Sequence, residues 1–216
     1  MFDGPFSASI IKRAIEKNLV SIDIVNLRDF AVDSYGTVDD HPYGGGTGMI
    51  LKVDIMDKAV QSIRAAHPDH PPYIILLTPQ GAPYRQKKAN LLAKKNHILL
   101  ICGHYEGFDE RIRSLADEEI SIGDYVLTGG EIPALVLADS IIRLIPKVLK
   151  RQDATFHESF GGEKGILEYP QYTKPNDYKT MNVPPVLLSG DHKKIEMWRK
   201  EQAQIKTKKN RKDLLG

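Results

Sequence analysis

The stretch EEISIGDYVLTGGEIPALVLADSIIR, residues 118–143, decides the fold. It begins with an apolar, β-prone run at 120–127, turns at Gly129-Gly130, and continues in a helical pattern with Pro133 near its start. Proline is tolerated in the first helical turn, where its missing N–H would have no partner. Glycines let backbone approach a ligand, and a helix start presents unpaired N–H groups. The stretch therefore predicts a strand, a glycine turn and a helix around a small molecule, with an ordinary turn as the plainer interpretation.

Apolar runs and helical periods alternate along the rest of the chain. Continuous apolar runs predict buried strands at 73–78 (YIILLT) and 97–102 (HILLIC), and alternation predicts a half-buried strand at 21–27 (SIDIVNL). Helical spacing of apolar residues predicts helices over 10–18, 52–66, 86–95 and 109–115, and from about 131 to 145. Strands that alternate with helices predict an α/β fold with a mostly parallel sheet.

The same periods name the residues that should face the core. The helix from about 131 is expected to bury Leu135, Ala138, Ile142 and Ile145, and the helix from 86 is expected to bury Leu91 and Leu92. On the last helix, Ile195, Trp198 and Ile205 share one side. Core packing is the preferred interpretation of that side, rather than a platform for stacking bases.

Composition divides the chain into three parts. Residues 1–149 hold the predicted α/β domain, and residues 150–165 (KRQDATFHESFGGEKG) are polar and glycine-rich without an apolar period, which is typical of an exposed linker or mobile loop. Residues 166–216 should form a small, mainly helical C-terminal domain.

Length and composition fit a globular protein with a substantial core. The chain has 216 residues, 41% of them hydrophobic, and no apolar run approaches the roughly 20 residues of a membrane span. The N-terminal residues lack the pattern of a secretory signal, and the single Cys102 lies in a predicted buried strand, which favours a reducing cytoplasm. The histidines show no metal-ligand spacing, so a structural zinc site is not expected.

Positive charge is concentrated at the C-terminal end. The net charge of the chain is +2, but residues 192–216 contain nine Lys or Arg against three acidic residues. A basic segment beside a slightly acidic body suits a polyanion such as nucleic acid. A solvated helix rich in lysine is the alternative, and the charge alone does not separate the two.

Three polar, glycine-containing loops follow apolar runs: TPQGAPY (78–84), GHYEG (103–107) and GDYVLTGGE (123–131). Ligands bind beyond the carboxyl ends of parallel strands, so loops that converge there would offer backbone donors and acceptors to an adenine or a ribose. Glu106 in the second loop could attract a cationic ligand such as a sulfonium or an ammonium, or could be a plain surface acid.

Further polar residues leave alternatives open. GGGTGM (44–49) lacks the Gly-Lys-Ser/Thr of a phosphate loop, so it is either a loop that closes over a bound group or a set of turns. Asp139 and Arg143 are spaced as an i,i+4 pair and could form a surface salt bridge. Glu158 in the polar linker has the surroundings of a solvated acid.

Six blocks of the sequence, taken together, resemble a known family. HPYGGGTGM, LLTPQG, ICGHYEGFDERI, DEEISIGDYVLTGGEIPALVLADSIIRLIP, YPQYTKP and VPPVLLSGDH are similar to the signature blocks of the bacterial tRNA (guanine-N1)-methyltransferases, in the same order and over nearly the whole chain. The resemblance implies an S-adenosylmethionine-dependent methyltransferase with a deep trefoil knot, a rare exception among protein folds. It also implies a homodimer whose subunits share each active site, and methylation of N1 of guanosine 37, next to the anticodon of tRNA.

The resemblance also implies roles for individual residues. Glu106 matches the acid near the methyl donor, Arg143 matches a cation near guanine O6, and Glu158 matches the general base, although the family usually has aspartate there. Thr47 stands where the family usually has proline. The adenosine pocket would be lined by Leu76, Leu77, Thr78, Pro79, Gly103, Tyr105, Ser121, Ile122, Gly123, Asp124, Tyr125, Val126, Leu127, Gly129 and Gly130.

Two other functions remain open at this point. One is a knotted methyltransferase that acts on a different RNA nucleotide, and the other is an RNA-binding protein without catalytic activity. In each case the linker and the basic C-terminal helix are expected to hold RNA largely through its phosphates. The sequence does not decide whether magnesium takes part.

Overall fold

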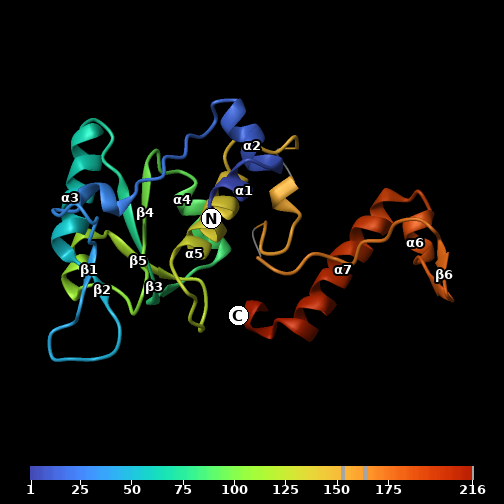
Figure 1. The fold of residues 1–216 in the computed structure, drawn as a ribbon. Helices are drawn as coiled ribbons and strands as arrows, with labels where there is room; N and C mark the ends of the chain where they lie inside the picture. Colours follow the sequence, from blue (N-terminus) through green and yellow to red (C-terminus); the bar gives the residue numbers. More distant parts are fainter. Residues whose placement is uncertain (152–153, 163–164, 216) are drawn as a thin grey trace. The chain divides into compact units, whose positions relative to one another are not determined.

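The chain forms two compact units, Met1–Lys150 and Arg151–Gly216. The computed structural model describes residues 1–151, 154–162 and 165–215. The first unit contains a parallel sheet with helices on both faces, and the second contains a long C-terminal helix (Figure 1). The predicted α/β class with a central parallel sheet is confirmed.

Three strands form the sheet of the first unit. The central strand β3 (Tyr73–Pro83) lies between β4 (Ile98–Cys102) and β5 (Glu118–Ser121), and both pairings are parallel. The other elements of this unit are α1 (Asp3–Phe6), α2 (Ser9–Glu16), the 3-10 helix η1 (Leu27–Phe30), β1 (Asp39–Asp40), β2 (Ile50–Leu51), α3 (Val53–Ala66), α4 (Gln86–Leu92), the 3-10 helix η2 (Glu110–Leu115) and α5 (Glu131–Ile142).

Alternate residues of β3 build two cores, because successive side chains of a strand point to opposite faces. Ile74 and Leu76 pack with α3 on one face, and Ile75 and Leu77 pack with α4 and α5 on the other. Figure 1 shows the sheet between α3 and the pair α4 and α5. The strands predicted at 73–78 and 97–102 are confirmed, since burial on both faces gives continuous apolar runs.

Helix α5 is buried on two sides. Its residues Ala134, Leu137 and Ile141 pack against the sheet, whereas Ala138 and Ile142 pack against α2. The residues predicted to face the core therefore included some that pack against α2, Ala138 and Ile142, but none of those that pack against the sheet. A helix that is apolar on most sides offers no single stripe from which to choose.

The strand predicted at 21–27 is wrong. Residues 20–26 run outside any β-ladder of the described chain, and η1 begins at Leu27. Ile22 packs behind α5, but the side chain of Ile24 is 57% exposed. Alternation of apolar and polar residues requires only one buried face, and here the buried side meets a helix rather than a partner strand. The segment predicted as a helix at 109–115 is the 3-10 helix η2.

Two predicted core residues are exposed. In α4, Leu92 is 2% exposed and Leu91 is 51% exposed, because the seven-residue helix turns only one of two adjacent leucines inward. In the second unit, Ile205 is 51% exposed, whereas Ala203 and Thr207 form the buried side of its helix.

The second unit is organised around α7 (His192–Asn210). Asp191 caps this helix by accepting hydrogen bonds from the N–H groups of Lys193 and Lys194, both at 3.1 Å. Trp198 of α7 lies beside Tyr172. The other elements are the 3-10 helix η3 (Ala154–Phe156), β6 (Asp177–Tyr178), β7 (Met181–Asn182), α6 (Pro185–Leu188) and the 3-10 helix η4 (Lys212–Leu215).

A buried hydroxyl joins α7 to the preceding chain. Thr207 Oγ1 accepts a hydrogen bond from the N–H of Leu167 (3.0 Å) and donates one to the carbonyl of Ala203 (2.7 Å). No helix in the part of the chain that the structure describes has both the length and the hydropathy to span a membrane.

Candidate methyl-donor pocket

A pocket lies at the carboxyl ends of the three parallel strands. The bulge within β3 and the loops after β4 and β5 meet there, as expected for parallel strands that run to one edge of a sheet. The residues that line it are Leu77, Thr78, Pro79, Gly103, His104, Tyr105, Glu106, Gly107, Phe108, Ile120, Ser121, Ile122, Gly123, Tyr125, Val126, Leu127, Thr128, Gly129, Gly130 and Pro133.

Most of the residues proposed from the family resemblance for the adenosine pocket lie in this lining. The exceptions are Leu76 and Asp124. Leu76 is fully buried in the core on the α3 side of the sheet, because neighbouring residues of β3 face opposite ways. The lining also contains residues that the family resemblance did not assign to the adenosine pocket: His104, Gly107, Phe108, Ile120, Thr128 and Pro133. Each of them lies within or beside a segment already named, so position along the chain was the available signal.

The third loop lies directly against the end of β4. The N–H of Gly130 donates a hydrogen bond of 2.7 Å to the carbonyl of Gly103, and Gly129 forms an antiparallel bridge with His104. A Cβ atom at Gly130 would lie 2.6 Å from the Cα of Cys102. Only glycine permits this approach of two backbones, which closes one wall of the pocket.

The first loop begins inside β3. The ladder between β3 and β5 pairs Leu77 with Ile120, breaks, and resumes at Ala82. Residues 78–81 form a bulge, in which Thr78 Oγ1 accepts a hydrogen bond from the N–H of Gln80 (3.3 Å). Bulges redirect side chains and are common next to active sites. This one turns Thr78 and Pro79 toward the pocket.

The second loop holds Tyr105 in the left-handed region of backbone conformation, with φ = 59°. Non-glycine residues rarely adopt this conformation, which is frequent at functional sites. The N–H of Tyr105 donates to His104 Nδ1 (3.0 Å). The N–H of Glu106 donates to the carbonyl of Met49 (3.2 Å), and the Glu106 side chain lies against Gly48. The glycine-rich segment 44–49 therefore reaches the rim of the pocket.

The charge of the pocket suits a cationic ligand. Among the described residues that line it, Glu106 is the one carboxylate, and none is Lys or Arg. Cys102 lies just beneath, where burial, assisted by the carboxylate of Glu131, raises the pKa of its thiol to about 12. A thiol that stays protonated is a poor nucleophile, so Cys102 serves packing rather than chemistry.

The two proposed catalytic residues lie in different units. Arg143 directly follows α5 in the first unit, and its N–H donates to the carbonyl of Asp139 (3.3 Å). Glu158 belongs to the second unit, in a turn where its carbonyl accepts a hydrogen bond from the N–H of Gly161 (2.9 Å). Neither residue lines the pocket.

The turn that carries Glu158 is well bonded for a segment without an apolar period. The N–H of Phe160 donates to the carbonyl of Ile166 (2.9 Å), and the N–H of Glu168 donates to Ser159 Oγ (3.1 Å). These bonds fasten the Glu158 turn to the chain of the second unit.

Comparison with known proteins identifies the family. Residues 1–216 match the model of the family described as tRNA (Guanine-1)-methyltransferase TrmD. Proteins named tRNA (guanine-N(1)-)-methyltransferase from Dictyoglomus turgidum, Carboxydothermus hydrogenoformans and Bacillus pumilus are 54%, 50% and 50% identical to this chain. These alignments cover 100% of this chain and 85%, 83% and 87% of the respective relatives. The chain therefore belongs to the tRNA (guanine-N1)-methyltransferase family.

Proposed function

We propose that this chain transfers a methyl group from S-adenosylmethionine to N1 of guanosine 37 in tRNA. Its family membership makes it a tRNA (guanine-N1)-methyltransferase. The methyl donor and the position of the guanosine go beyond that membership. The observation that carries them is the pocket at the carboxyl-end edge of the sheet, where backbone from three loops surrounds Glu106, the one carboxylate among the described lining residues.

The lining of the pocket fits the methyl donor. Backbone N–H and C=O groups of the three loops can read the edges of an adenine, and apolar side chains such as Ile122 and Leu127 can cover its faces. Glu106 supplies the negative charge that attracts a sulfonium. When bound, S-adenosylmethionine supplies an electrophilic methyl group, since its positive sulfur can leave as a neutral thioether.

The proposed chemistry begins with a proton. N1 of neutral guanine carries a hydrogen and is a poor nucleophile, so we assign Glu158 to accept that proton as general base. The negative charge that develops spreads onto O6, where the guanidinium of Arg143 stabilises it. N1 then gains the methyl group, and the electron pair of the broken sulfur–carbon bond stays on sulfur.

The two assigned residues belong to different compact units, which is compatible with a proposed active site shared between subunits. The pocket and Arg143 lie in the first unit, whereas Glu158 lies in the second. We propose that two chains form a homodimer in which Glu158 of one subunit serves the pocket of the other. The close backbone crossings at Gly130 and at Gly81 support a further proposal, that the chain is threaded here into a trefoil knot.

The basic residues of α7 suit the phosphates of tRNA. Their side chains are mostly exposed, and phosphate contacts of this kind position a protein on nucleic acid without reading sequence. They are Lys193, Lys194, Arg199, Lys200, Lys206, Lys208 and Lys209.

Methylation of transcripts tests the proposed target. A tRNA transcript with guanosine at position 37 should accept a labelled methyl group, and the same transcript with adenosine 37 should not. Equal labelling of both would favour a methyltransferase for another nucleotide. If S-adenosylmethionine fails to bind the purified chain in calorimetry, a non-catalytic RNA-binding protein becomes the better interpretation.

Substitution of Glu158 tests the base. Glu158→Ala should lower kcat by roughly 10²- to 10⁴-fold, the usual contribution of a positioned general base. Glu158→Asp keeps the carboxylate and should retain most of the activity. An unchanged rate for Glu158→Ala would exclude Glu158 as the base.

Mixed dimers test the shared site. Glu158→Ala and Glu106→Ala subunits, each inactive alone, should recover part of the activity after mixing, because one of the two sites in a mixed dimer is intact. No recovery after verified subunit exchange would contradict the arrangement.

A further inference from the structure

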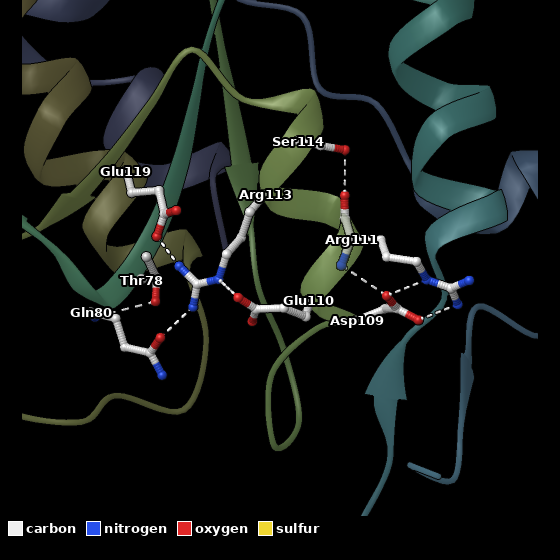
Figure 2. Close-up of polar contacts among 8 residues, drawn as sticks. All are labelled: Thr78, Gln80, Asp109, Glu110, Arg111, Arg113, Ser114 and Glu119. Atoms are coloured by element: carbon white, nitrogen blue, oxygen red, sulfur yellow. Dashed lines mark hydrogen bonds and ion pairs between the residues drawn. The ribbon is translucent and has the colours of Figure 1, made fainter.

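Arg113 of η2 joins three parts of the first unit. Its guanidinium donates hydrogen bonds to the carboxylate of Glu119 in β5 and to the side-chain oxygen of Gln80 in β3. The carboxylate of Glu110 lies 2.9 Å from Nε, an ion pair that is out of line for a hydrogen bond. Figure 2 shows the guanidinium between these three side chains. The Arg113 side chain is 20% exposed, so water screens these contacts only in part.

The contact with Gln80 reaches the bulge of β3. Residues 78–81 fall in the break of the β3–β5 ladder, so the ladder itself does not fix them. The side chain of Gln80 ties this bulge to Arg113, and the N–H of Gln80 donates to Thr78 Oγ1. Thr78 and Pro79 line the pocket, whereas Gln80 and Arg113 do not.

Arg113 also lies against Phe108. Its guanidinium carbon is 5.4 Å from the centroid of the Phe108 ring, within the range of a cation–π interaction. Phe108 lines the pocket from the loop after β4, and its backbone bridges Leu51 of β2. The guanidinium of Arg113 therefore contacts Gln80 in the bulge of β3 and Phe108 in the loop after β4, two of the three segments that build the pocket.

We propose that Arg113 is a positioning residue for the methyl-donor pocket, which holds the bulge at 78–81 through Gln80 and the ring of Phe108 by stacking. The expected effect on donor binding rests on the proposed donor site, but the ordering of the bulge can be measured in the free protein without any ligand. Arg113 meets no substrate itself, so it should alter affinity for the donor more than the rate of the chemical step.

Arg111, on the same 3-10 helix, provides a matched control. Its guanidinium forms two hydrogen bonds with Asp109, at 2.9 and 2.7 Å, and its side chain is 70% exposed. It points away from Arg113 (Figure 2). Removal of Arg111 deletes an arginine–carboxylate ion pair on η2, as removal of Arg113 does, but it breaks no contact with the bulge.

Three variants separate the positioning role from general stability. Gln80→Met removes the link to the bulge and leaves both carboxylates of Arg113 paired. Arg113→Lys keeps the charge but cannot bridge three partners with one planar group. Arg111→Met is the control. Hydrogen exchange of the free protein reports order at residues 78–82, and calorimetry with S-adenosylmethionine reports the consequence.

We expect Gln80→Met and Arg113→Lys to speed exchange at residues 78–82 and to raise the Kd for S-adenosylmethionine by about tenfold, with kcat changed less than twofold. The double variant should be no worse than Arg113→Lys alone, because Gln80→Met removes only a contact that Arg113→Lys already disrupts. Arg111→Met should change neither readout.

Each outcome decides a different statement. Unchanged exchange and affinity in both variants, with normal donor binding by the wild type, would overturn the role of Arg113 and leave the proposed function intact. Faster exchange in the two variants, together with a wild-type protein that does not bind S-adenosylmethionine, would support the ordering role and overturn the proposed donor. Equal effects of Arg111→Met would show that loss of any arginine pair on η2 suffices, and would overturn the assignment.

Discussion

Gly130→Ala is the sharpest test of the way the pocket is built. The backbone of Gly130 has φ = −80° and ψ = −6°, which alanine adopts freely, so the substitution introduces no conformational strain. The added Cβ would lie 2.6 Å from the Cα of Cys102 and 2.8 Å from the nitrogen of Gly103. Carbon atoms in contact normally lie about 3.5–4.0 Å apart, so the two backbones must separate by roughly 1 Å.

The size of the effect follows from three contributions. An extra methyl group in a close-packed contact costs about 1–3 kcal/mol of unfolding free energy. Separation of the backbones also weakens the 2.7 Å hydrogen bond from Gly130 to Gly103, a loss of about 0.5–1.5 kcal/mol. Loss of unfolded-chain entropy favours alanine by about 0.4–1 kcal/mol. The net destabilisation is therefore about 0.5–4 kcal/mol.

Urea unfolding followed by far-UV circular dichroism measures this change, since the midpoint reports stability at constant slope. The single tryptophan, Trp198, belongs to the second unit, so its fluorescence provides an internal control. Gly4→Ala is the matched control variant, because a Cβ atom there meets nothing within 4 Å. If Gly130→Ala unfolds at the wild-type midpoint and binds S-adenosylmethionine normally, the close approach is not needed and this account of the pocket fails.

Three further predictions concern other parts of the chain. Thr207→Val leaves the partly buried N–H of Leu167 without its acceptor and should destabilise the second unit by about 1–3 kcal/mol in unfolding followed by Trp198 fluorescence, whereas Thr207→Ser should not. The pKa of Cys102 is raised from its ordinary value of 9.0 to about 12, so its stabilising contribution is complete below pH 9.0 and is lost as pH rises toward 12. Urea midpoints should fall less steeply over that range in Cys102→Ala than in the wild type, and equal slopes would contradict the burial of the thiol. Lys208→Gln with Lys209→Gln should weaken binding of all tRNAs alike and reduce the slope of log K against log salt by about 1–2; an unchanged slope would remove these lysines from the interface.

The strands of the sheet could be predicted because burial on both faces requires a continuous run of apolar residues in the sequence. A strand covered on both faces must be apolar at every position, as in YIILLT, and no surface element imitates that run. The segment 21–27 shows the opposite case. Its alternation records one buried side, but it cannot say whether that side belongs to a paired strand or to extended chain beside a helix.

The pocket could be predicted at the level of loops, and less well at the level of single residues. Parallel strands bring their carboxyl ends together, so three loops after apolar runs were sufficient to locate it. The side chain of Leu76 packs in the core on the α3 side of the sheet, because adjacent residues of β3 face opposite sides, and the neighbouring Leu77 lines the pocket. Arg113 gave no signal, since its contact with Gln80 depends on a break in the ladder that the amino-acid sequence does not show.

Gly81 and Gly130 explain why the sequence marks this region with glycines. Neither has a positive φ, so a turn alone would accept another residue at either position. A Cβ atom at Gly81 would lie 2.6 Å from the carbonyl carbon of Glu119, and the corresponding contact of Gly130 is with Cys102. Both glycines thus lie where one stretch of backbone crosses another, in β5 and at the end of β4. Because these crossings bring together the loops that line the pocket, close packing of backbone is the physical condition for forming the pocket that we propose as the methyl-donor site.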